Sequence, residues 1–278
     1  MSFDEFRLLD TGYCLAREGM LIQGGSFKIV ECHCMVALLR HPVRGWGLWD
    51  TGYAPRMWEE TRRLPNRIYR WAAPLPAQPD RSVLSQLAPM GLEATDIRWI
   101  VLSHLHGDHV SGLRDFPEAL LYVASEAYEY VRKTQGVASV LKAYLPNLLP
   151  EDFKDRVQFI QPVGGMCLEA PDSTLDMFGD GAALLFPLPG HARGQIGMLA
   201  ETRSGKVIFV ADAVYHRDSI RQELPPGRLT NLIADDPGQV LPTIRRLSAF
   251  TQANPNIRVY PTHCSETYRE CIVEGRNC

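Results

Sequence analysis

The chain has 278 residues, 45% of them hydrophobic and 22% charged, and its formal net charge is −3 at pH 7. This length and apolar content allow a sizeable buried core, and we expect a single domain over residues 1–278. Proteins that bind nucleic acids through their charge are usually strongly basic. This chain is slightly acidic, so we expect no nucleic-acid partner.

The N-terminal segment and the cysteines indicate a reduced compartment. The first ten residues, MSFDEFRLLD, lack the positive segment and apolar run of a secretory signal. No apolar run approaches the roughly 18 residues that a membrane helix needs. The seven cysteines, an odd number at irregular spacing, make a poor disulfide framework. We therefore expect a cytoplasmic protein with no membrane partner.

The first third of the chain predicts two strands and then a long irregular segment. Residues 34–39 (CMVALL) and 45–50 (GWGLWD) are short runs rich in aliphatic and aromatic residues, and an Asp-Thr-Gly turn closes the second. Residues 56–79 follow, rich in Arg, Pro and Trp and without a clean period. Long irregular segments in compact domains are often binding loops, which makes this one a candidate substrate wall.

The middle of the chain predicts two helices with a strand between them. Residues 79–91 carry apolar side chains at helical spacing, and Ser125 is a candidate N-cap for a helix over residues 126–133. Residues 97–102 (IRWIVL) form a strand-like run that leads directly into a group of histidines. Residues 143–153 are irregular again and are a second candidate wall.

The last third of the chain predicts three strands and a long helix. Residues 182–188, 206–210 and 257–260 are the strand-like runs, and an Asp-Pro pair opens a helix through residues 239–251. Residues 216–232 are the third irregular segment. Strands and helices alternate loosely along the whole chain, which predicts an α/β protein: a mixed sheet with helices on its outer faces.

A tight cluster of imidazoles and a carboxylate follows the strand-like run 97–102. His104, His106, Asp108 and His109 lie within six residues of a chain that has only eight histidines. In extended backbone His104 and His106 point to one side, and Gly107 lets the chain turn tightly. Neutral imidazole and carboxylate are ligands that zinc and iron prefer. Four such ligands from so tight a turn suit two metal ions better than one.

Three further candidate ligands come directly after strand-like runs. His191 follows the run 182–188, Asp212 follows VIFVA, and His263 follows VYPT. Loops at one end of the strands form the site in open sheets, so these side chains are expected to meet the cluster. A lone histidine or aspartate after a strand is usually structural, but beside the cluster each becomes a candidate ligand.

The HLHGDH segment resembles the H-x-H-x-D-H signature of the metallo-β-lactamase-fold hydrolases. The resemblance runs from about Leu8 to Cys264 and includes Asp50-Thr51-Gly52, Pro189-Gly190-His191, Ala211-Asp212 and Thr262-His263. It implies a four-layer αββα sandwich with the metal ions at one edge of the paired sheets. It is much less specific for the substrate, because this fold carries many chemistries.

The resemblance also implies an arrangement of the ligands around two divalent ions, zinc first and iron or manganese as alternatives. The first ion takes His104, His106 and His191, the second takes Asp108, His109 and His263, and Asp212 bridges both. Asp50 has no place in either set, and we expect it to support a ligand instead.

Two such ions imply hydrolysis. Divalent ions roughly 3.5–4 Å apart hold a water between them and lower its pKa toward about 7, so a bridging hydroxide attacks the substrate. Asp108 would relay a proton to the leaving group. Tyr215 stands three residues after Asp212, as in the quorum-quenching N-acyl homoserine lactonases that this chain resembles. There a tyrosine at this offset binds the substrate carbonyl oxygen, which would stabilise an oxyanion.

The expected function is therefore the opening of a lactone or related ester, a small-molecule substrate. A phosphodiester or thioester hydrolase and an iron-dependent thiol oxygenase with one metal site remain alternatives, as does a metal-free binding module. Cys32-His33-Cys34 is expected to be structural, and no role is assigned to Cys264. The oligomeric state stays open, and a homo-oligomer is compatible with the sequence.

Overall fold

Two mixed β-sheets face each other in the computed structural model, which describes residues 1–161 and 174–276. The first sheet has the order β1-β2-β3-β4-β5-β6. Its strands are β1 (Glu5–Arg17), β2 (Ile29–His41), β3 (Gly45–Trp49), β4 (Ile97–Val101), β5 (Leu120–Ala124) and β6 (Val157–Ile160). The pairs β1–β2 and β2–β3 are antiparallel, and β3 to β6 run parallel.

The second sheet has the order β11-β10-β9-β8-β7. Its strands are β7 (Leu175–Asp176), β8 (Ala183–Pro187), β9 (Ile196–Thr202), β10 (Gly205–Ala211) and β11 (Arg258–Pro261). Only β10 and β11 pair in parallel; the other neighbours are antiparallel. The parallel pair matters for function, because the carboxyl ends of β10 and β11 come to the same edge of the sheet.

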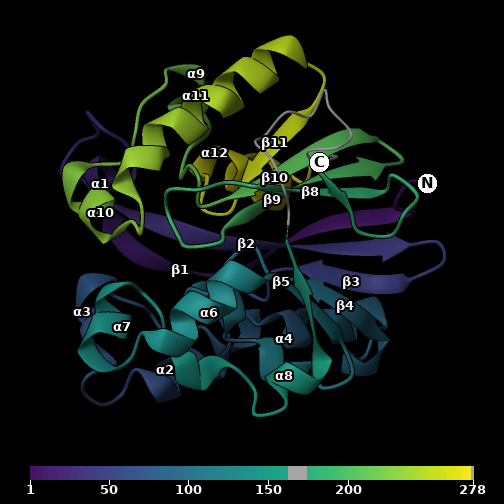
Figure 1. Ribbon diagram of the computed structural model, residues 1–278, viewed down its shortest axis with the longest axis horizontal. Coiled ribbons are helices and arrows are strands. Elements are labelled where there is room, and N and C mark those ends of the chain that lie inside the picture. Colours follow the sequence, from purple (N-terminus) through teal and green to yellow (C-terminus); the bar gives the residue numbers. More distant parts are fainter. Residues whose placement is uncertain (162–173, 277–278) are drawn as a thin grey trace.

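Helices cover the outer faces of both sheets, so the molecule has four layers (Figure 1). Those beside the first sheet are α2 (Pro55–Glu60), α3 (Arg67–Ala72), α4 (Val83–Leu87), α6 (Ser125–Lys133), α7 (Gly136–Leu141) and α8 (Phe153–Arg156). Those beside the second sheet are α9 (Arg217–Arg221), α11 (Pro237–Ala253) and α12 (Ser265–Thr267). The short helices α1 (Glu18–Leu21) and α10 (Arg228–Ile233) contact each other at one end of the sandwich. The expected αββα sandwich is confirmed.

The core between the sheets is apolar and rich in aromatic rings. Trp49 at the end of β3 packs against Phe209 of β10, with ring centroids 5.9 Å apart, and Phe209 packs against Tyr260 of β11. These side chains are almost fully buried. Burial of apolar surface at roughly 25 cal/mol per Å² is what holds the two sheets together. The ends of β3, β10 and β11 are thereby fixed relative to one another.

All six predicted strands are present, but β1, β5, β6, β7 and β9 were not predicted. Of these, β1 is the longest. Its sequence, EFRLLDTGYCLAR, contains Asp10-Thr11-Gly12, which has the composition of a turn. In the structure the β1–β2 register shifts between Asp10 and Tyr13, and Gly12 has a φ of 112°. This is a bulge within a long strand, and glycine permits its backbone conformation.

The helix predictions are partly wrong. Residues 79–91 break into a 3₁₀ turn at Pro79–Arg81, α4, and another 3₁₀ turn at Ala88–Met90, because Ser82 is extended and caps α4. Ala124, and not Ser125, is the N-cap of α6, and Ser125 is the first residue of the helix. The long predicted helix over 239–251 is confirmed as α11.

The three irregular segments contain short helices that sequence periodicity did not reveal. The segment 56–79 carries most of α2 and all of α3, and the segment 216–232 carries α9 and most of α10. The segment 143–153 contains the 3₁₀ turn Pro146–Leu148 and ends on the first residue of α8. Helices of four to six residues are too short to show a period, and packing rather than propensity stabilises them.

The cysteines depart from the expectation of a fully reduced chain. Cys14, Cys32, Cys34 and Cys264 are buried free thiols, whereas Cys271 is disulfide-bonded. The odd number and irregular spacing of the cysteines therefore did not predict the disulfide bond of Cys271. Among residues 1–161 and 174–276, no helix is both long and apolar enough to cross a lipid bilayer.

Candidate metal centre

Five strand ends bring polar side chains to one edge of the sandwich. In the first sheet, Asp50 follows β3 and the segment from Ser103 to His109 follows β4. In the second sheet, His191, Asp212 and His263 follow β8, β10 and β11. The prediction that the candidate ligands meet at the carboxyl ends of strands is confirmed, and the two sheets share the site.

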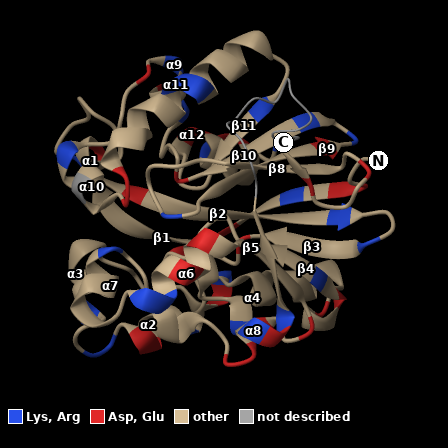
Figure 2. Ribbon diagram, in the orientation of Figure 1, with Lys and Arg blue, Asp and Glu red and all other residues tan. Residues whose placement is uncertain are grey.

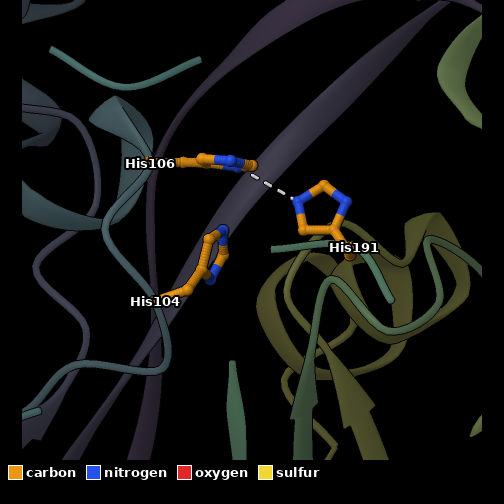
Figure 3. Close-up of side chains that lie close together, drawn as sticks. All are labelled: His104, His106 and His191. Atoms are coloured by element: carbon orange, nitrogen blue, oxygen red, sulfur yellow. Dashed lines mark hydrogen bonds between the residues drawn. The ribbon is translucent and has the colours of Figure 1, made fainter. Parts of the chain in front are cut away.

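The first group of three donors is His104, His106 and His191, with one ligand atom of each lying within 4.8 Å of the others. His106 Nδ1 lies 3.0 Å from His191 Nε2, although 85 residues separate them in the sequence. The three imidazoles converge on one point from opposite sheets (Figure 3). β4 ends at Val101, so a loop after the strand, and not the strand period, places His104 and His106 together.

The second group is Asp108, His109 and His263, again with ligand atoms within 4.8 Å of one another. Asp212 lies between the two groups. Its Oδ2 is 3.1 Å from His263 Nε2 and 3.5 Å from His191 Nε2, and its Oδ1 is 3.4 Å from His109 Nε2. A carboxylate in this place can reach both groups with its two oxygens.

Hydrogen bonds at Nδ1 fix the ring orientation of three of the histidines. His109 Nδ1 donates to Asp50 Oδ2 at 2.9 Å, and His263 Nδ1 donates to the His33 carbonyl at 2.6 Å. Ser103 Oγ donates to Asp50 and therefore accepts from His104 Nδ1, at 2.9 Å. Each of these rings consequently turns its other nitrogen, Nε2, toward the centre of the site. Asp50 supports His109 in the way that the sequence predicted.

The donor atoms that point inward include several without partners. His104 Nε2, His109 Nε2 and Asp212 Oδ1 are buried and make no hydrogen bond in the structure. His109 Nε2 and Asp212 Oδ1 have only the 3.4 Å ion pair between them, and His104 Nε2 has no hydrogen-bond partner. A buried polar atom without a hydrogen bond costs about 1–3 kcal/mol, so this cluster requires an explanation. Imidazole nitrogens and carboxylate oxygens at this spacing fit divalent cations of the zinc, iron or manganese type.

The charges of the site also favour a cation. Burial raises the pKa of Asp108, but His109 and His263 outweigh it and lower that pKa to about 2. Burial lowers the pKa of His109 and His263, yet nearby carboxylates, Asp212 foremost, raise both well above the usual value. Burial and neighbouring histidines lower the pKa of His106 to about 3. The buried carboxylates are thus stabilised by positive charge. Without a metal ion, protons on His109 and His263 supply that charge.

Two residues next to the site have a left-handed backbone. Asp50 has a φ of 62° and Ala211 a φ of 47°, and neither is a glycine. Such conformations cost of order 1–3 kcal/mol and are concentrated at functional sites. They turn the chain sharply at the ends of β3 and β10, which aims Asp50 and Asp212 into the site. Gly107, in contrast, has no positive φ; a side chain there would crowd Leu145 and Met57.

A cavity of about 240 Å³ opens directly over the donor atoms. His106, Asp108, His191, Asp212, Tyr215 and His263 form its polar floor. The walls are almost entirely apolar and come from α1, α3, α7 and α10; they include Met20, Leu21, Ile68, Ala72, Val140, Leu141 and Ile233. All three irregular segments predicted as substrate walls contribute lining residues, through Ile68, Ala143 and Thr230 among others.

Tyr215 lies at this floor and is buried. Its hydroxyl is 3.2 Å from His191 Nδ1, and its ring stacks on His263 at 5.8 Å between centroids. Burial, together with the charge of Asp212, raises the pKa of the phenol well above its usual value. The hydroxyl therefore keeps its proton and can accept from His191 while donating to another group in the cavity.

Several cysteines and one further histidine lie near the site without joining it. Cys32 lines the cavity floor, and Cys34 donates from its Sγ to the Asp108 carbonyl at 3.2 Å. His216 caps α9 by accepting from the Asp218 amide. His216 also groups with Cys264 and Glu266, but that carboxylate already pairs with Arg221, which disfavours a cation there.

Sequence reasoning missed three residues that organise the site. Ser103 orients His104 through its hydroxyl, and its position directly before the first histidine was the available signal. The ring of Tyr144 packs on His106 at 4.7 Å, and its hydroxyl donates to Asp235 Oδ2 at 2.5 Å. Nothing in the local sequence marks Tyr144 or Asp235, because both act through contacts between distant segments.

Comparisons with known proteins agree with this geometry. The family model of the metallo-beta-lactamase superfamily matches residues 29–263. An N-acyl homoserine lactonase, AttM, of Azorhizobium caulinodans is 29% identical over 157 residues, which is 55% of each chain. The matched region spans about half the length of that relative, so its activity is not carried over on identity alone.

Solved structures show the same fold. An N-acyl homoserine lactone hydrolase with the product N-hexanoyl-L-homoserine at its catalytic metal centre has a TM-score of 0.74 and 21% identity, covering 98% of this chain and 97% of its own. AidC, a dizinc quorum-quenching lactonase in complex with its product, has a TM-score of 0.63 and 16% identity, covering 95% and 90%. At these identities the likeness extends to the fold alone.

Proposed function

The chain belongs to the metallo-beta-lactamase superfamily, and we propose that it is a metal-dependent hydrolase that opens a lactone or a related ester. One observation carries the proposal. Two groups of three His and Asp donors meet at Asp212 on the polar floor of an otherwise apolar cavity. The lactonases among the relatives and structural neighbours support the choice of substrate class.

Seven residues would hold two divalent ions, zinc first and iron or manganese as alternatives. His104, His106 and His191 form one set, Asp108, His109 and His263 form the other, and Asp212 reaches both. Bound there, the ions would polarise a substrate carbonyl and lower the pKa of water toward about 7. Every other part of the chemistry falls to the side chains and the cavity.

Tyr215 is proposed to bind the carbonyl oxygen of the substrate. Its hydroxyl accepts from His191 Nδ1, which leaves its own proton free to point into the cavity. Because the phenol pKa is raised, the proton stays in place at neutral pH and stabilises negative charge that develops on that oxygen.

Asp108 is proposed to move the proton. It lies at the cavity floor with its Oδ2 3.4 Å from His263 Nε2, and its low pKa keeps the carboxylate ionised until a reaction step delivers a proton. It would accept the proton of the attacking water and pass it to the leaving alkoxide of the opened ring.

The apolar walls favour a substrate with an aliphatic tail. Leu141 of α7 and Ile233 of α10 line the cavity and remain partly exposed at its mouth. Each buried methylene contributes about 0.8 kcal/mol, so a longer acyl chain would bind more tightly against these side chains.

The deciding measurement is metal content per chain for protein purified without added metal, followed by assays on lactones, phosphodiesters and thioesters. We expect about two ions per chain and preferential lactone opening, with both reduced in Asp212→Asn. A single iron ion per chain together with oxygen consumption on a small thiol would overturn the proposal.

The same assays test whether the apolar walls bind the acyl tail of the substrate. Leu141→Ala and Ile233→Ala are expected to raise KM for long-chain lactones about 3- to 10-fold and to leave short-chain lactones unchanged. Val137→Ala is the matched control, because Val137 also lies exposed on α7 but does not line the cavity. Equal effects of all three substitutions would contradict the assignment of the acyl tail to these walls.

A further inference from the structure

A second groove lies on the other side of α3 and is lined by arginines. Arg62, Arg67 and Arg70 line this groove of about 440 Å³ together with Trp71, Leu15 and residues 74–76. We call it the arginine groove. The opposite face of α3, with Ile68 and Tyr69, lines the cavity over the candidate metal centre, which we call the catalytic cavity. One short helix thus separates an apolar cavity from a basic groove, and the two are distinct sites.

The arginines of this groove are not neutralised by ion pairs within the described part of the chain. Among the residues that the structure describes, no carboxylate forms an ion pair with Arg62, Arg67 or Arg70. The charge-coloured ribbon shows basic positions in α3 and in the loop before it (Figure 2). Three guanidinium groups around one groove repel each other, and an anion placed among them would relieve that repulsion.

A second cavity lined by arginines shows that arginines without ion pairs are not a general feature of this chain. A cavity of about 390 Å³ beside α9 is also lined by arginines, among them Arg217 and Arg221. There Arg217 pairs with Glu270 at 2.6 Å and Arg221 with Glu266 at 2.8 Å. The chain therefore neutralises its arginines with carboxylates in one cavity and leaves them open in the other.

An exposed aromatic ring completes the arginine groove. Trp71 is 62% exposed, although tryptophan is among the most apolar side chains, and the Arg67 guanidinium lies 5.7 Å from its ring centroid. An indole that is open on one face offers a stacking platform for a planar ring, worth about 1–3 kcal/mol for a nucleic-acid base. Guanidinium groups bind phosphate oxygens in pairs.

We propose that the arginine groove binds a nucleoside diphosphate or triphosphate. The phosphates occupy the space between Arg62, Arg67 and Arg70, and the base stacks on the open face of Trp71. The volume of about 440 Å³ suits a ligand of this size. The proposal does not depend on the hydrolytic reaction, because none of these side chains reaches the catalytic cavity.

The test is a titration of the full chain with ADP, pyrophosphate and adenosine, followed by calorimetry and tryptophan fluorescence. ADP is expected to bind at least about tenfold more tightly than either part alone, because charge and stacking contribute together. The double substitution Arg67→Ala/Arg70→Ala is expected to weaken ADP binding about 100-fold, and Trp71→Ala to weaken ADP but not pyrophosphate.

Two controls separate this groove from other sites. Arg63→Ala should leave the affinity unchanged, since Arg63 is exposed but does not line the groove. His104→Ala should also leave it unchanged, which excludes phosphate binding at the candidate metal centre. An unchanged melting temperature of the double variant would show that its fold is intact.

Several outcomes would overturn the proposal. Pyrophosphate binding as tightly as ADP would reduce the groove to a general anion site. A single-stranded oligonucleotide that displaces ADP at lower concentration would indicate a nucleic-acid surface instead. ADP affinity that falls in His104→Ala and persists in the arginine double variant would move the ligand to the metal centre.

Discussion

At the scale of single residues, the site is organised by what each histidine does with its Nδ1 atom. His104, His109 and His263 each donate from Nδ1 to a fixed oxygen, on Ser103, Asp50 and the His33 backbone respectively. The ring orientation and the free nitrogen follow from these bonds. Two of the three acceptors lie more than 50 residues away, so the protonation pattern is a tertiary property.

Asp50→Asn should weaken metal binding without unfolding the chain. Asparagine tolerates the left-handed backbone at this position, but a neutral amide holds His109 less firmly than a carboxylate does. We expect about 10- to 100-fold lower metal affinity, measured by competition with a chromophoric chelator.

The matched control for Asp50 is Asp180→Asn. Asp180 also accepts from a histidine, His41 Nε2, at 2.9 Å, but far from the donor groups. Equal losses of metal affinity in both variants would mean that the effect of Asp50 is a general loss of stability.

The burial of His106 predicts how the metal-free chain responds to acid. Its pKa is lowered to about 3 in the folded chain, against about 6.5 when unfolded. Between these values the unfolded chain binds a proton that the folded chain does not, so stability falls as the pH falls from about 6.5 to 3. Asp108, with a pKa of about 2, contributes only below about pH 4.

This pH dependence can be measured by urea unfolding between pH 4 and 7 in the presence of a chelator. The wild-type free energy of unfolding should fall more steeply toward pH 4 than that of His106→Gln, which cannot titrate. The difference in slope is at most about 1.4 kcal/mol per pH unit for one proton. Parallel curves would show that His106 is protonated in the folded chain.

At the scale of elements, two separate segments close over the site and are joined by Asp235. Asp235 Oδ2 accepts from the Tyr144 hydroxyl at 2.5 Å and from the Arg193 amide at 2.8 Å, and the Asp235 amide donates to the His191 carbonyl. Lys142 also reaches this segment, through the Ile233 and Ala234 carbonyls. The segment after α7, which packs on His106, is thereby tied to the loop that carries His191.

Tyr144→Phe should loosen this connection. The ring remains to pack on His106, but the buried carboxylate loses one donor, which costs about 1–3 kcal/mol of unfolding free energy. Hydrogen exchange should increase in the segment after α7 and in the His191 loop together. Tyr128→Phe is the control, since its hydroxyl has no partner among the described residues. Faster exchange in only one of the two segments would contradict the coupling.

At the scale of the whole molecule, the candidate metal centre joins the two sheets. His104, His106, Asp108 and His109 follow β4 of the first sheet; His191, Asp212 and His263 follow strands of the second sheet. Each donor group takes residues from both sheets. Ions held there would act as cross-links of the sandwich as well as reagents.

Removal of metal should therefore lower thermal stability. A ligand at a thousandfold excess over its Kd adds about 4 kcal/mol, which corresponds to a melting temperature about 10 °C higher in a chain of this size. Chelator should lower the melting temperature of the wild-type chain by about that amount, measured by calorimetry. It should have little effect on Asp212→Asn. An equal effect on both would place the metal elsewhere.

The sequence alone was sufficient to identify the family resemblance, six of the eleven strands, the long helix α11 and the seven candidate ligands that meet at one edge of the sandwich. The candidate ligands are recognisable from the local sequence, because each follows a run of apolar residues that predicts a strand. Strands β1, β5, β6, β7 and β9 and the helices α2, α3, α9 and α10 were not predicted. A bulge interrupts β1, and very short helices have no period that a sequence shows.

Only the tertiary structure decided how these residues work together. The roles of Ser103, Tyr144 and Asp235, the hydrogen bonds that orient the imidazole rings, and the apolar walls of the cavity all depend on contacts between distant segments. Such contacts form because apolar side chains such as Trp49 and Phe209 pack the sheets face to face. Hydrophobic packing is non-directional and leaves no local pattern, so the geometry of the site is decided by the fold as a whole.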